Sequence, residues 1–255
     1  MNCRIMSKKQ RKIIIIPARM AASRLPGKPL ADIGGKPMIQ HVWERAMAAD
    51  IAPVYVATDD NAIIDAITSV GGSAIMTRTD HPSGSDRVFE AIQAIDPDGA
   101  FDDILNLQGD LPEMPTSIPQ ALAAAMDRGS AELSTLVTRA TTEEATRSQV
   151  VKAVVGWENG QPLSGFGHAL YFSRAVVPTG TDELYHHVGV YGWRRAALER
   201  FIALPPSPLE KAEKLEQLRA LEAGMRISVA LIDHAAGGVD TAEDLAATRH
   251  RIAGR

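Results

Sequence analysis

Three basic side chains lie in the short segment that follows the first strongly apolar run of the chain. They are Arg19, Arg24 and Lys28, within IIIIPARMAASRLPGKPL, and three prolines stiffen the same segment. Phosphate groups bind where cations and backbone N–H groups are held in place. The segment has a single glycine, whereas a dinucleotide fingerprint has three. We interpret it as a loop that binds phosphates through side chains; the alternative is a solvated basic loop.

Two aspartates could complement this basic loop. Asp110 directly follows ILNLQG, so it should lie at the tip of a strand, where a carboxylate facing bound phosphates is a natural Mg²⁺ ligand. A single carboxylate rarely holds Mg²⁺ well, and Asp240, after a Gly-Gly-Val turn, is the best second candidate. Each has a local alternative, because Asp110 could cap a turn and Asp240 could be a helix N-cap.

A second polar loop, TRTDHPSGSDR, opens a predicted helix. Its small hydroxyl groups and exposed N–H groups could contact the edge of a base or hold an anion. The alternative is a set of helix caps, in which Ser83 or Ser85 caps the helix and Asp86 complements its dipole. Arg87 would then form a surface or core-facing ion pair.

The second half of the chain carries a candidate site for a hydroxyl-rich ligand. His186 and His187 are adjacent in a predicted strand, so they point to opposite faces and would not chelate one metal ion together. The only cysteine, Cys3, is distant, which argues against zinc. We expect His187, Glu216 and Gln217 to bind the hydroxyl-rich ligand instead.

Alternating strands and helices must position these residues in the first half. We expect strands at 13–16, 53–58, 73–76 and 102–110, a helix opened by Pro37 in its first turn, a second helix after Thr58-Asp59-Asp60, and a third over 85–95. This order predicts an α/β fold with a doubly wound, mostly parallel central sheet. The basic loop, the TRTDHPSGSDR loop and the loop at Asp110 should then converge beyond the carboxyl ends of the strands.

The second half is less regular. Strands are expected in 131–140, 150–157, 168–178, 186–195 and 226–233, a single helix over 207–224, and a final helix over 240–253 capped by Asp240 or Thr241. There is no internal repeat and no linker. We therefore expect a flexible tail over 1–12 and a single domain over 13–255 with a smaller inserted sub-region.

Bulk composition excludes several classes of protein. The chain has 255 residues, 45% of them hydrophobic, and a formal net charge of −4. This size supports a substantial core, and the charge gives no reason to expect nucleic-acid binding. No apolar run approaches the roughly 18 residues that cross a bilayer. With one cysteine there is no disulfide framework, so we expect a cytoplasmic protein with no membrane partner.

Several segments together resemble one enzyme family. IIIIPARMAASRLPGKPL, TRTDHPSGSDR, LNLQGD, ALYFSRAVVP, HHVGVYGW, SPLEKAEKLEQLR and GVDTAEDL occur in the order found in 3-deoxy-manno-octulosonate cytidylyltransferases, also called CMP-Kdo synthetases. The resemblance runs from about Ile13 to the final helix. The first segment is shared with other sugar nucleotidyltransferases, whereas its combination with SPLE…LEQLR and GVDT is much more specific.

The resemblance implies a glycosyltransferase-A-like nucleotidyltransferase fold, a homodimer and Mg²⁺ as cofactor. The implied reaction joins CTP and 3-deoxy-D-manno-octulosonate (Kdo) to give CMP-Kdo and pyrophosphate, for lipopolysaccharide biosynthesis. By similarity, the nucleotide would bind Pro17, Ala18, Arg19, Arg24, Lys28, Arg78, Ser83 and Gly84. The sugar acid would bind Gln108, Arg174, His187, Glu216 and Gln217. The metal would bind Asp110 and Asp240, and the catalytic residues would be Lys28, Asp110 and Asp240.

The chain departs from the family pattern at one position beside the expected metal site. Many members have QGDEP where this chain has QGDLP, so Leu111 replaces a carboxylate and Glu113 stands two residues further on. Two alternatives to a Kdo enzyme stay open, and Leu111 supports only the second of them. One is a cytidylyltransferase for a related sugar acid, such as 8-amino-Kdo or a sialic acid. The other is a non-catalytic nucleotide-binding protein on the same fold.

Overall fold

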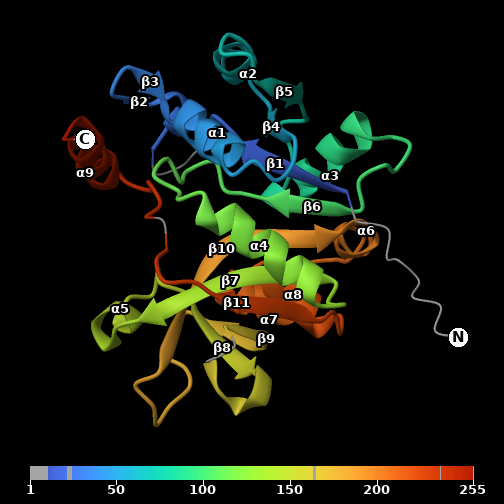
Figure 1. Cartoon of the computed structure of the whole chain (residues 1–255), viewed down its shortest axis with the longest axis vertical. Helices are drawn as coiled ribbons and strands as arrows, with labels where there is room; N and C mark the ends of the chain where they lie inside the picture. Colours follow the sequence, from blue (N-terminus) through green and yellow to red (C-terminus); the bar gives the residue numbers. More distant parts are fainter. Residues whose placement is uncertain (1–10, 22–24, 163–164, 236, 255) are drawn as a thin grey trace, which may run out of the picture.

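A single nine-stranded sheet forms the centre of the molecule (Figure 1). The computed structural model describes residues 11–21, 25–162, 165–235 and 237–254. The strands are β1 (Lys12–Ala18), β4 (Val54–Thr58), β5 (Ser73–Met76), β6 (Asp103–Asn106), β7 (Leu133–Ala140), β8 (Lys152–Trp157), β9 (Phe166–Ser173), β10 (Leu184–Arg194) and β11 (Ile227–Leu231), in the order β5-β4-β1-β6-β10-β7-β11-β9-β8. A separate small ribbon pairs β2 (Asp32–Ile33) with β3 (Lys36–Pro37).

The strands from the first half of the chain are parallel, as expected. β1 pairs in parallel with β4 on one side and with β6 on the other, and β4 pairs in parallel with β5. Ile13 and Ile15 of β1 belong to one core cluster, whereas Ile14 and Ile16 belong to another, and all four are fully buried. The continuous isoleucine run therefore reflects a strand covered on both faces.

The expectation of a mostly parallel sheet is wrong for the other half. β10 runs antiparallel to both β6 and β7, and β9 runs antiparallel to both β8 and β11. Among the described strands of this half, β7 and β11 are the one parallel pair. The link between β8 and β9 is short. Such a link cannot carry the chain back for a parallel pairing, which needs a crossover of a dozen or more residues.

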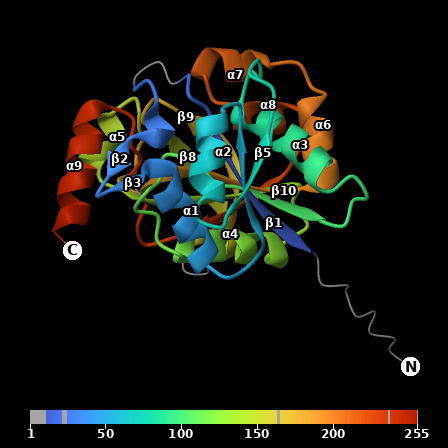
Figure 2. The same ribbon diagram turned by 90° about the horizontal axis from the view of Figure 1, so that it is seen from above.

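Helices cover both faces of the sheet. They are α1 (Met38–Ala48), α2 (Asn61–Thr68), α3 (Gly84–Ile95), α4 (Ser117–Arg128), α5 (Thr142–Thr146), α6 (Arg195–Ile202), α7 (Pro208–Glu213), α8 (Gln217–Glu222) and α9 (Ala242–Ala253), with 3-10 turns at Lys28–Leu30 and Glu158–Gly160. Buried residues of α1, α2 and α4 share one core cluster, and those of α3, α6 and α8 share the other. Figure 2 shows α1 and α4 on the opposite side of the sheet from α3 and α6.

Some element boundaries differ from those expected. Lys12 already belongs to β1, so the predicted tail is shorter at that end, and residues 1–10 lie outside the described part of the chain. Pro37 is the N-cap of α1 and not a residue of its first turn. The strand expected over 102–110 ends at Asn106.

The helix expected over 207–224 is two helices. α7 ends at Glu213, Lys214 adopts a left-handed conformation with φ 55°, and α8 begins at Gln217. A non-glycine residue rarely adopts positive φ, so the leucine spacing alone could not predict this break.

The capping alternatives of two loops are resolved. Ser83 caps α3, accepting a hydrogen bond from the backbone N–H of Asp86. Thr241 caps α9 in a capping box with Asp244, so Asp240 is not the N-cap of that helix.

The search of the described helices for one long and apolar enough to cross a membrane finds none.

Candidate active site

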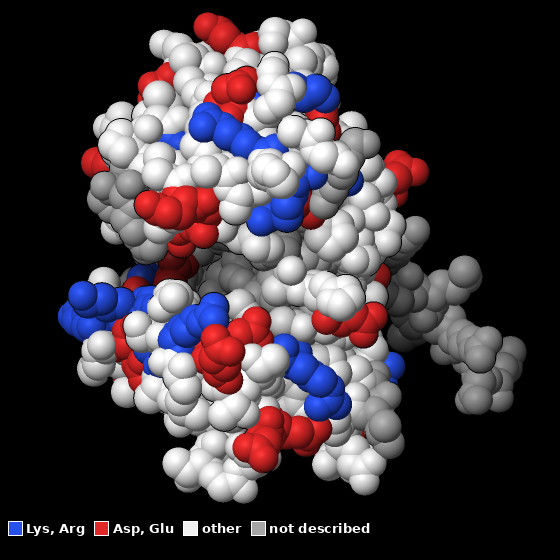
Figure 3. Space-filling view, turned by 90° about the vertical axis from the view of Figure 1, so that its left-hand side faces the viewer, with Lys and Arg blue, Asp and Glu red and all other residues white. Residues whose placement is uncertain are grey.

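Two cavities meet beyond the carboxyl ends of β1 and β6. The first has a volume of about 300 Å³ and the second about 450 Å³. Gly84, Gln108, Asp110 and Asp240 line both of them. β1 and β6 run toward the left of Figure 1, and the view from that side shows a hollow with acidic and basic side chains on its rim (Figure 3). The two cavities therefore form one site with a shared wall.

The basic loop forms one wall of the first cavity, as predicted. The predicted residues that line this cavity are Pro17, Ala18, Arg19, Lys28, Ser83 and Gly84. Arg24 lies outside the described residues. Gly109 explains how two loops approach here, since a Cβ atom on it would lie 2.8 Å from the carbonyl oxygen of Pro17. Any side chain at that position would push the loop after β6 away from the end of β1.

Lys28 joins the two predicted metal ligands. Its Nζ lies 2.8 Å from Asp110 Oδ2 and 3.2 Å from Asp240 Oδ1, and it also donates to the carbonyl oxygen of Val239 at 2.9 Å. The backbone N–H of Val239 donates to the carbonyl oxygen of Asp110 at 3.0 Å, which ties the two loops together. Asp110 and Asp240 are 130 positions apart in the sequence, and the fold brings both carboxylates onto the positive charge of Lys28.

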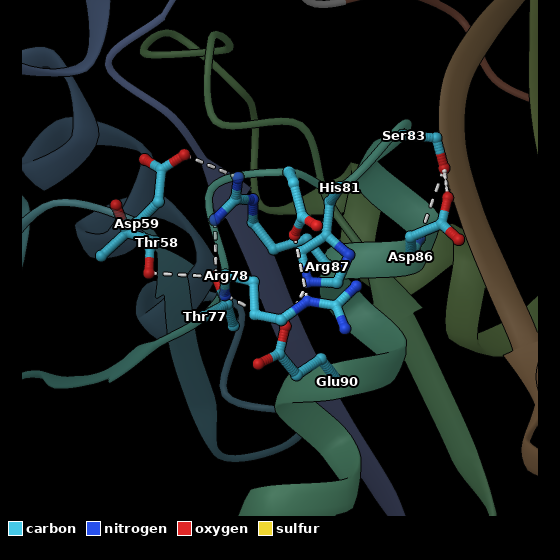
Figure 4. Close-up of polar contacts among 10 residues, drawn as sticks. Thr58, Asp59, Thr77, Arg78, His81, Ser83, Asp86, Arg87 and Glu90 are labelled. Atoms are coloured by element: carbon cyan, nitrogen blue, oxygen red, sulfur yellow. Dashed lines mark hydrogen bonds and ion pairs between the residues drawn. The ribbon is translucent and has the colours of Figure 1, made fainter.

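The TRTDHPSGSDR loop contributes Arg87 to the first cavity in place of the expected Arg78. Arg78 lines neither cavity; its side chain is two-thirds exposed and its Nε pairs with Asp80 at 3.0 Å. Arg87 lines the first cavity, is 3% exposed, and donates to Asp59 at 2.8 Å and to Thr77 at 2.5 Å (Figure 4). Arg87 is therefore the buried cation of this loop, and its ion pair fixes the loop against the end of β4.

His81 also lines the first cavity, and its ring contacts α3. Its Nε2 forms a short contact with Glu90 on α3, and the backbone N–H of Arg78 donates to the same carboxylate (Figure 4). Burial works to raise the pKa of Glu90, but the hydrogen bonds from His81 and Arg78 outweigh it and hold that pKa below its ordinary value. The loop is thereby fixed to α3 at a second point.

Neutral polar groups dominate one wall of the second cavity. Burial, reinforced by the neighbouring His186, lowers the pKa of His187 to about 3. Thr135 donates to the carbonyl oxygen of Val190 at 2.8 Å, so its oxygen is free to accept from His187 Nε2 at 2.9 Å. His187 Nδ1 then accepts from the amide of Gln217 at 3.4 Å. The imidazole is thus neutral and held in one tautomer.

Glu216 reaches the same cavity from the break between α7 and α8. Burial raises its pKa, while hydrogen bonds from Ser85 and Ser83 and the charge of Arg219 oppose that rise. Gln217, the first residue of α8, lies beside it and also lines the cavity. The break that the leucine pattern did not reveal is therefore what delivers the two predicted residues to the site.

Arg174 lines the second cavity, but its guanidinium is already engaged. It donates to the carbonyl oxygens of Glu213 at 2.8 Å, Ser148 at 3.1 Å and Lys214 at 3.3 Å. Arg174 therefore connects the end of α7 to the segment before β8, in addition to any contact with a ligand.

Comparison with known proteins identifies the family. Residues 13–227 match the model of the Cytidylyltransferase family. A protein from Azorhizobium caulinodans named 3-deoxy-manno-octulosonate cytidylyltransferase is 55% identical over 242 residues, which cover 94% of this chain and 95% of that protein. One of the same name from Paramagnetospirillum magneticum is 55% identical over 93% of this chain and 96% of that protein. The chain belongs to the 3-deoxy-manno-octulosonate cytidylyltransferase family.

Solved structures agree with this assignment. A CMP:2-keto-3-deoxy-manno-octonic acid synthetase complexed with CTP superimposes with a TM-score of 0.87 at 40% identity, over 96% of this chain and 99% of that one. A cytidylyltransferase from Leptospira borgpetersenii serovar Hardjo-bovis has a TM-score of 0.62 at 16% identity, over 96% and 88% of the two chains, which shows a shared fold. The resemblance predicted from the sequence motifs is confirmed.

The position that departs from the family pattern is part of the core. Leu111 is 8% exposed and packs in the cluster that contains α1 and α4. Glu113 lines neither cavity and pairs with Arg251 of α9 at 2.6 Å. Glu113 therefore does not supply the candidate site with a carboxylate in place of the one that the sequence motif led us to expect at position 111.

Sequence reasoning missed several lining residues. Arg87 and His81 in the first cavity, and Asn106 and Tyr191 in the second, were not among the predicted site residues. Asn106 carries a usable signal, because it is a polar residue between the apolar residues Leu105 and Leu107. Asn106 directly faces Tyr191 across the β6–β10 pair.

Proposed function

We propose that the protein transfers CMP from CTP to Kdo and releases pyrophosphate. The observation that carries the proposal is the pair of joined cavities. The basic loop lines one, polar side chains of both neutral and charged types line the other, and Asp110 and Asp240 lie in their shared wall. A nucleoside triphosphate suits the basic cavity, and a polyhydroxylated acid suits the polar one. In this arrangement the α-phosphorus of the nucleotide and a hydroxyl of the sugar acid meet at the shared wall.

The reaction is a direct displacement at phosphorus. The anomeric hydroxyl oxygen of Kdo forms a bond to the α-phosphorus, the bond from that phosphorus to the pyrophosphate oxygen breaks, and the hydroxyl proton is released. Both substrates are anions, so the protein's main tasks are alignment and charge neutralisation. Arg19 and Lys28 offset the negative charge that builds on the leaving pyrophosphate. His187, Glu216 and Gln217 orient the sugar acid.

Asp110 and Asp240 would hold Mg²⁺. Their oxygens already converge on the Lys28 ammonium group, at 2.8 and 3.2 Å, so the pair is arranged around a single positive charge. Mg²⁺ is usually held by one or two carboxylates together with substrate phosphates, and the described residues contain no cluster of three or more candidate ligands that would form an all-protein cage. When bound, the ion supplies charge neutralisation and orientation at the α-phosphate.

We further propose a cytoplasmic homodimer. The single cysteine fits a reducing compartment, and both substrates of the proposed reaction are soluble anions. Size-exclusion chromatography with light scattering measures the oligomeric state directly, and a mass near 27.4 kDa would contradict the dimer.

The proposed function is tested by pyrophosphate release. The purified protein is given CTP, UTP, ATP or GTP with Kdo, 8-amino-Kdo or a sialic acid, each with Mg²⁺ and with a chelator. We expect release with CTP and Kdo, dependent on the metal. Preference for another sugar acid would move the protein to a related activity, and CTP binding without release from any pair would show a non-catalytic nucleotide-binding protein.

A further inference from the structure

One buried polar side chain in the wall of the second cavity has an oxygen atom without a hydrogen-bond partner among the described residues. Asn106, the last residue of β6, is 1% exposed, and its Oδ1 forms no hydrogen bond with any described residue. It nevertheless lines the second cavity. A buried carbonyl oxygen without a partner costs stability, since its lost contacts with water are not replaced. Such a group in a cavity wall indicates a contact that a ligand completes.

The sheet aims Asn106 toward the second cavity. Asn106 stands opposite Tyr191 of β10, which lines the same cavity. Side chains two residues apart on a strand lie on the same face, and Gln108, two residues on, lines the cavity too. Leu107, between them, is buried in the opposite core cluster. The three polar groups therefore present one continuous surface to a ligand.

We propose that Asn106 is a specificity-determining residue that binds a hydroxyl group of the second substrate. This inference rests on the proposed function, because it takes the second cavity as the sugar-acid site. A carboxylate could not donate a hydrogen bond to Oδ1, whereas a hydroxyl can. A hydroxyl group both donates and accepts, so it satisfies either end of the carboxamide. A ligand without that hydroxyl would leave the buried amide unpaired, which is how such sites reject analogues.

The proposal predicts that one substitution at Asn106 weakens binding of the sugar acid without lowering the stability of the protein. Asn106→Leu keeps the number and branching of the side-chain heavy atoms and removes both polar groups. We expect the KM for the sugar acid to rise about tenfold or more, because the buried hydroxyl loses its partner. The KM for CTP should stay within about twofold. The melting temperature of the free protein should stay the same or rise, because a buried carbonyl oxygen without a described partner is removed.

A control variant comes from a comparable group elsewhere. Trp43 Nε1 is also buried without a described partner, but Trp43 lines neither cavity. Trp43→Phe should leave both KM values unchanged. If Asn106→Leu lowers the melting temperature and raises both KM values together, Asn106 is a structural residue and the proposal is wrong.

Deoxygenated substrates provide the decisive version of this test. Wild-type protein and Asn106→Leu are assayed with Kdo analogues that each lack one hydroxyl group. The analogue lacking the partner hydroxyl should lose kcat/KM about tenfold or more with the wild type and much less with Asn106→Leu. Equal losses in both proteins for every analogue would overturn the proposal. A wild-type protein inactive with all sugar acids would instead overturn the proposed function.

If Asn106→Leu does not fold, Asn106→Ala replaces it. That variant also removes the carboxamide, although it leaves space for water at the same position. We therefore expect the KM for the sugar acid to rise in this variant too. An unchanged KM for the sugar acid in a folded Asn106→Ala protein would also contradict the inference.

Discussion

The neutral state of His187 predicts a specific dependence of stability on pH. The pKa of His187 is about 3 in the folded protein because its ring is buried, against 6.5 in an unfolded chain. Between these values the unfolded chain binds a proton that the folded protein does not. Stability is therefore fully present above pH 6.5 and is lost as the pH falls from 6.5 toward 3.

The magnitude follows from the size of the shift. At pH 5.0 the unfolded histidine lies 1.5 units below its own pKa of 6.5, while the folded histidine is still neutral. At about 1.36 kcal/mol per unit, His187 alone should reduce the free energy of unfolding by about 2 kcal/mol between pH 7.5 and pH 5.0.

Urea unfolding at the two pH values measures this effect. Other groups also titrate over this range, so the comparison needs the variant His187→Gln, which keeps an amide able to reach Thr135. The loss of unfolding free energy between pH 7.5 and 5.0 should be smaller in the variant by about 2 kcal/mol. An equal loss in both proteins would refute the assignment of a buried neutral imidazole. An imidazole NMR signal of His187 that titrates near pH 6.5 in the folded protein would refute it as well.

Three further predictions concern the first cavity and the shared wall. Asp110→Asn should lower kcat by about 100-fold or more while the circular dichroism spectrum stays native; near-normal turnover would remove Asp110 from the metal site. Lys28→Met should lower kcat by about 100-fold and change the KM for the sugar acid little; the reverse pattern in steady-state kinetics would place Lys28 at the sugar. Arg87→Met leaves Asp59 buried without its partner, so urea unfolding should show a loss of about 3 kcal/mol, and the KM for CTP should rise; unchanged stability would show that the ion pair does not fix the loop.

The first half of the fold was predictable because local signals agreed with the tertiary structure. The isoleucine run of β1 is apolar on both faces, and Ser83 caps α3 at its expected start. The carboxyl ends of parallel strands share one edge of the sheet, so the convergence of the basic loop with Asp110 followed from topology alone.

The second half was harder because long-range contacts decide its structure. The leucine spacing predicted one helix over 207–224, but Glu213 accepts hydrogen bonds from Ser173 Oγ at 2.7 Å and from the Arg174 N–H at 2.9 Å, at the point where α7 ends. These partners are about 40 residues away in sequence and leave no local pattern. The antiparallel course of β10 is equally invisible to periodicity, which is the same for both pairings.

In the candidate site, too, some features were predictable from the sequence and others depended on long-range contacts. Motif resemblance located the walls of both cavities, although the roles of the individual residues stay predictions. Arg78 and Arg87 flank the same loop, and sequence could not tell which is buried, because that depends on Asp59 at the end of a different strand. Asn106 became a candidate only once the structure showed its Oδ1 buried without a described partner.

The central claim is that one site joins a cytidine nucleotide to a sugar acid at phosphorus. ³¹P NMR of the protein with CTP, Kdo and Mg²⁺ follows that phosphorus atom directly. We expect the α-phosphorus signal of CTP to disappear, a phosphodiester signal to appear, and pyrophosphate to form in equal amount. A triphosphate spectrum that persists in the presence of folded protein, or pyrophosphate formed without a phosphodiester, would contradict it.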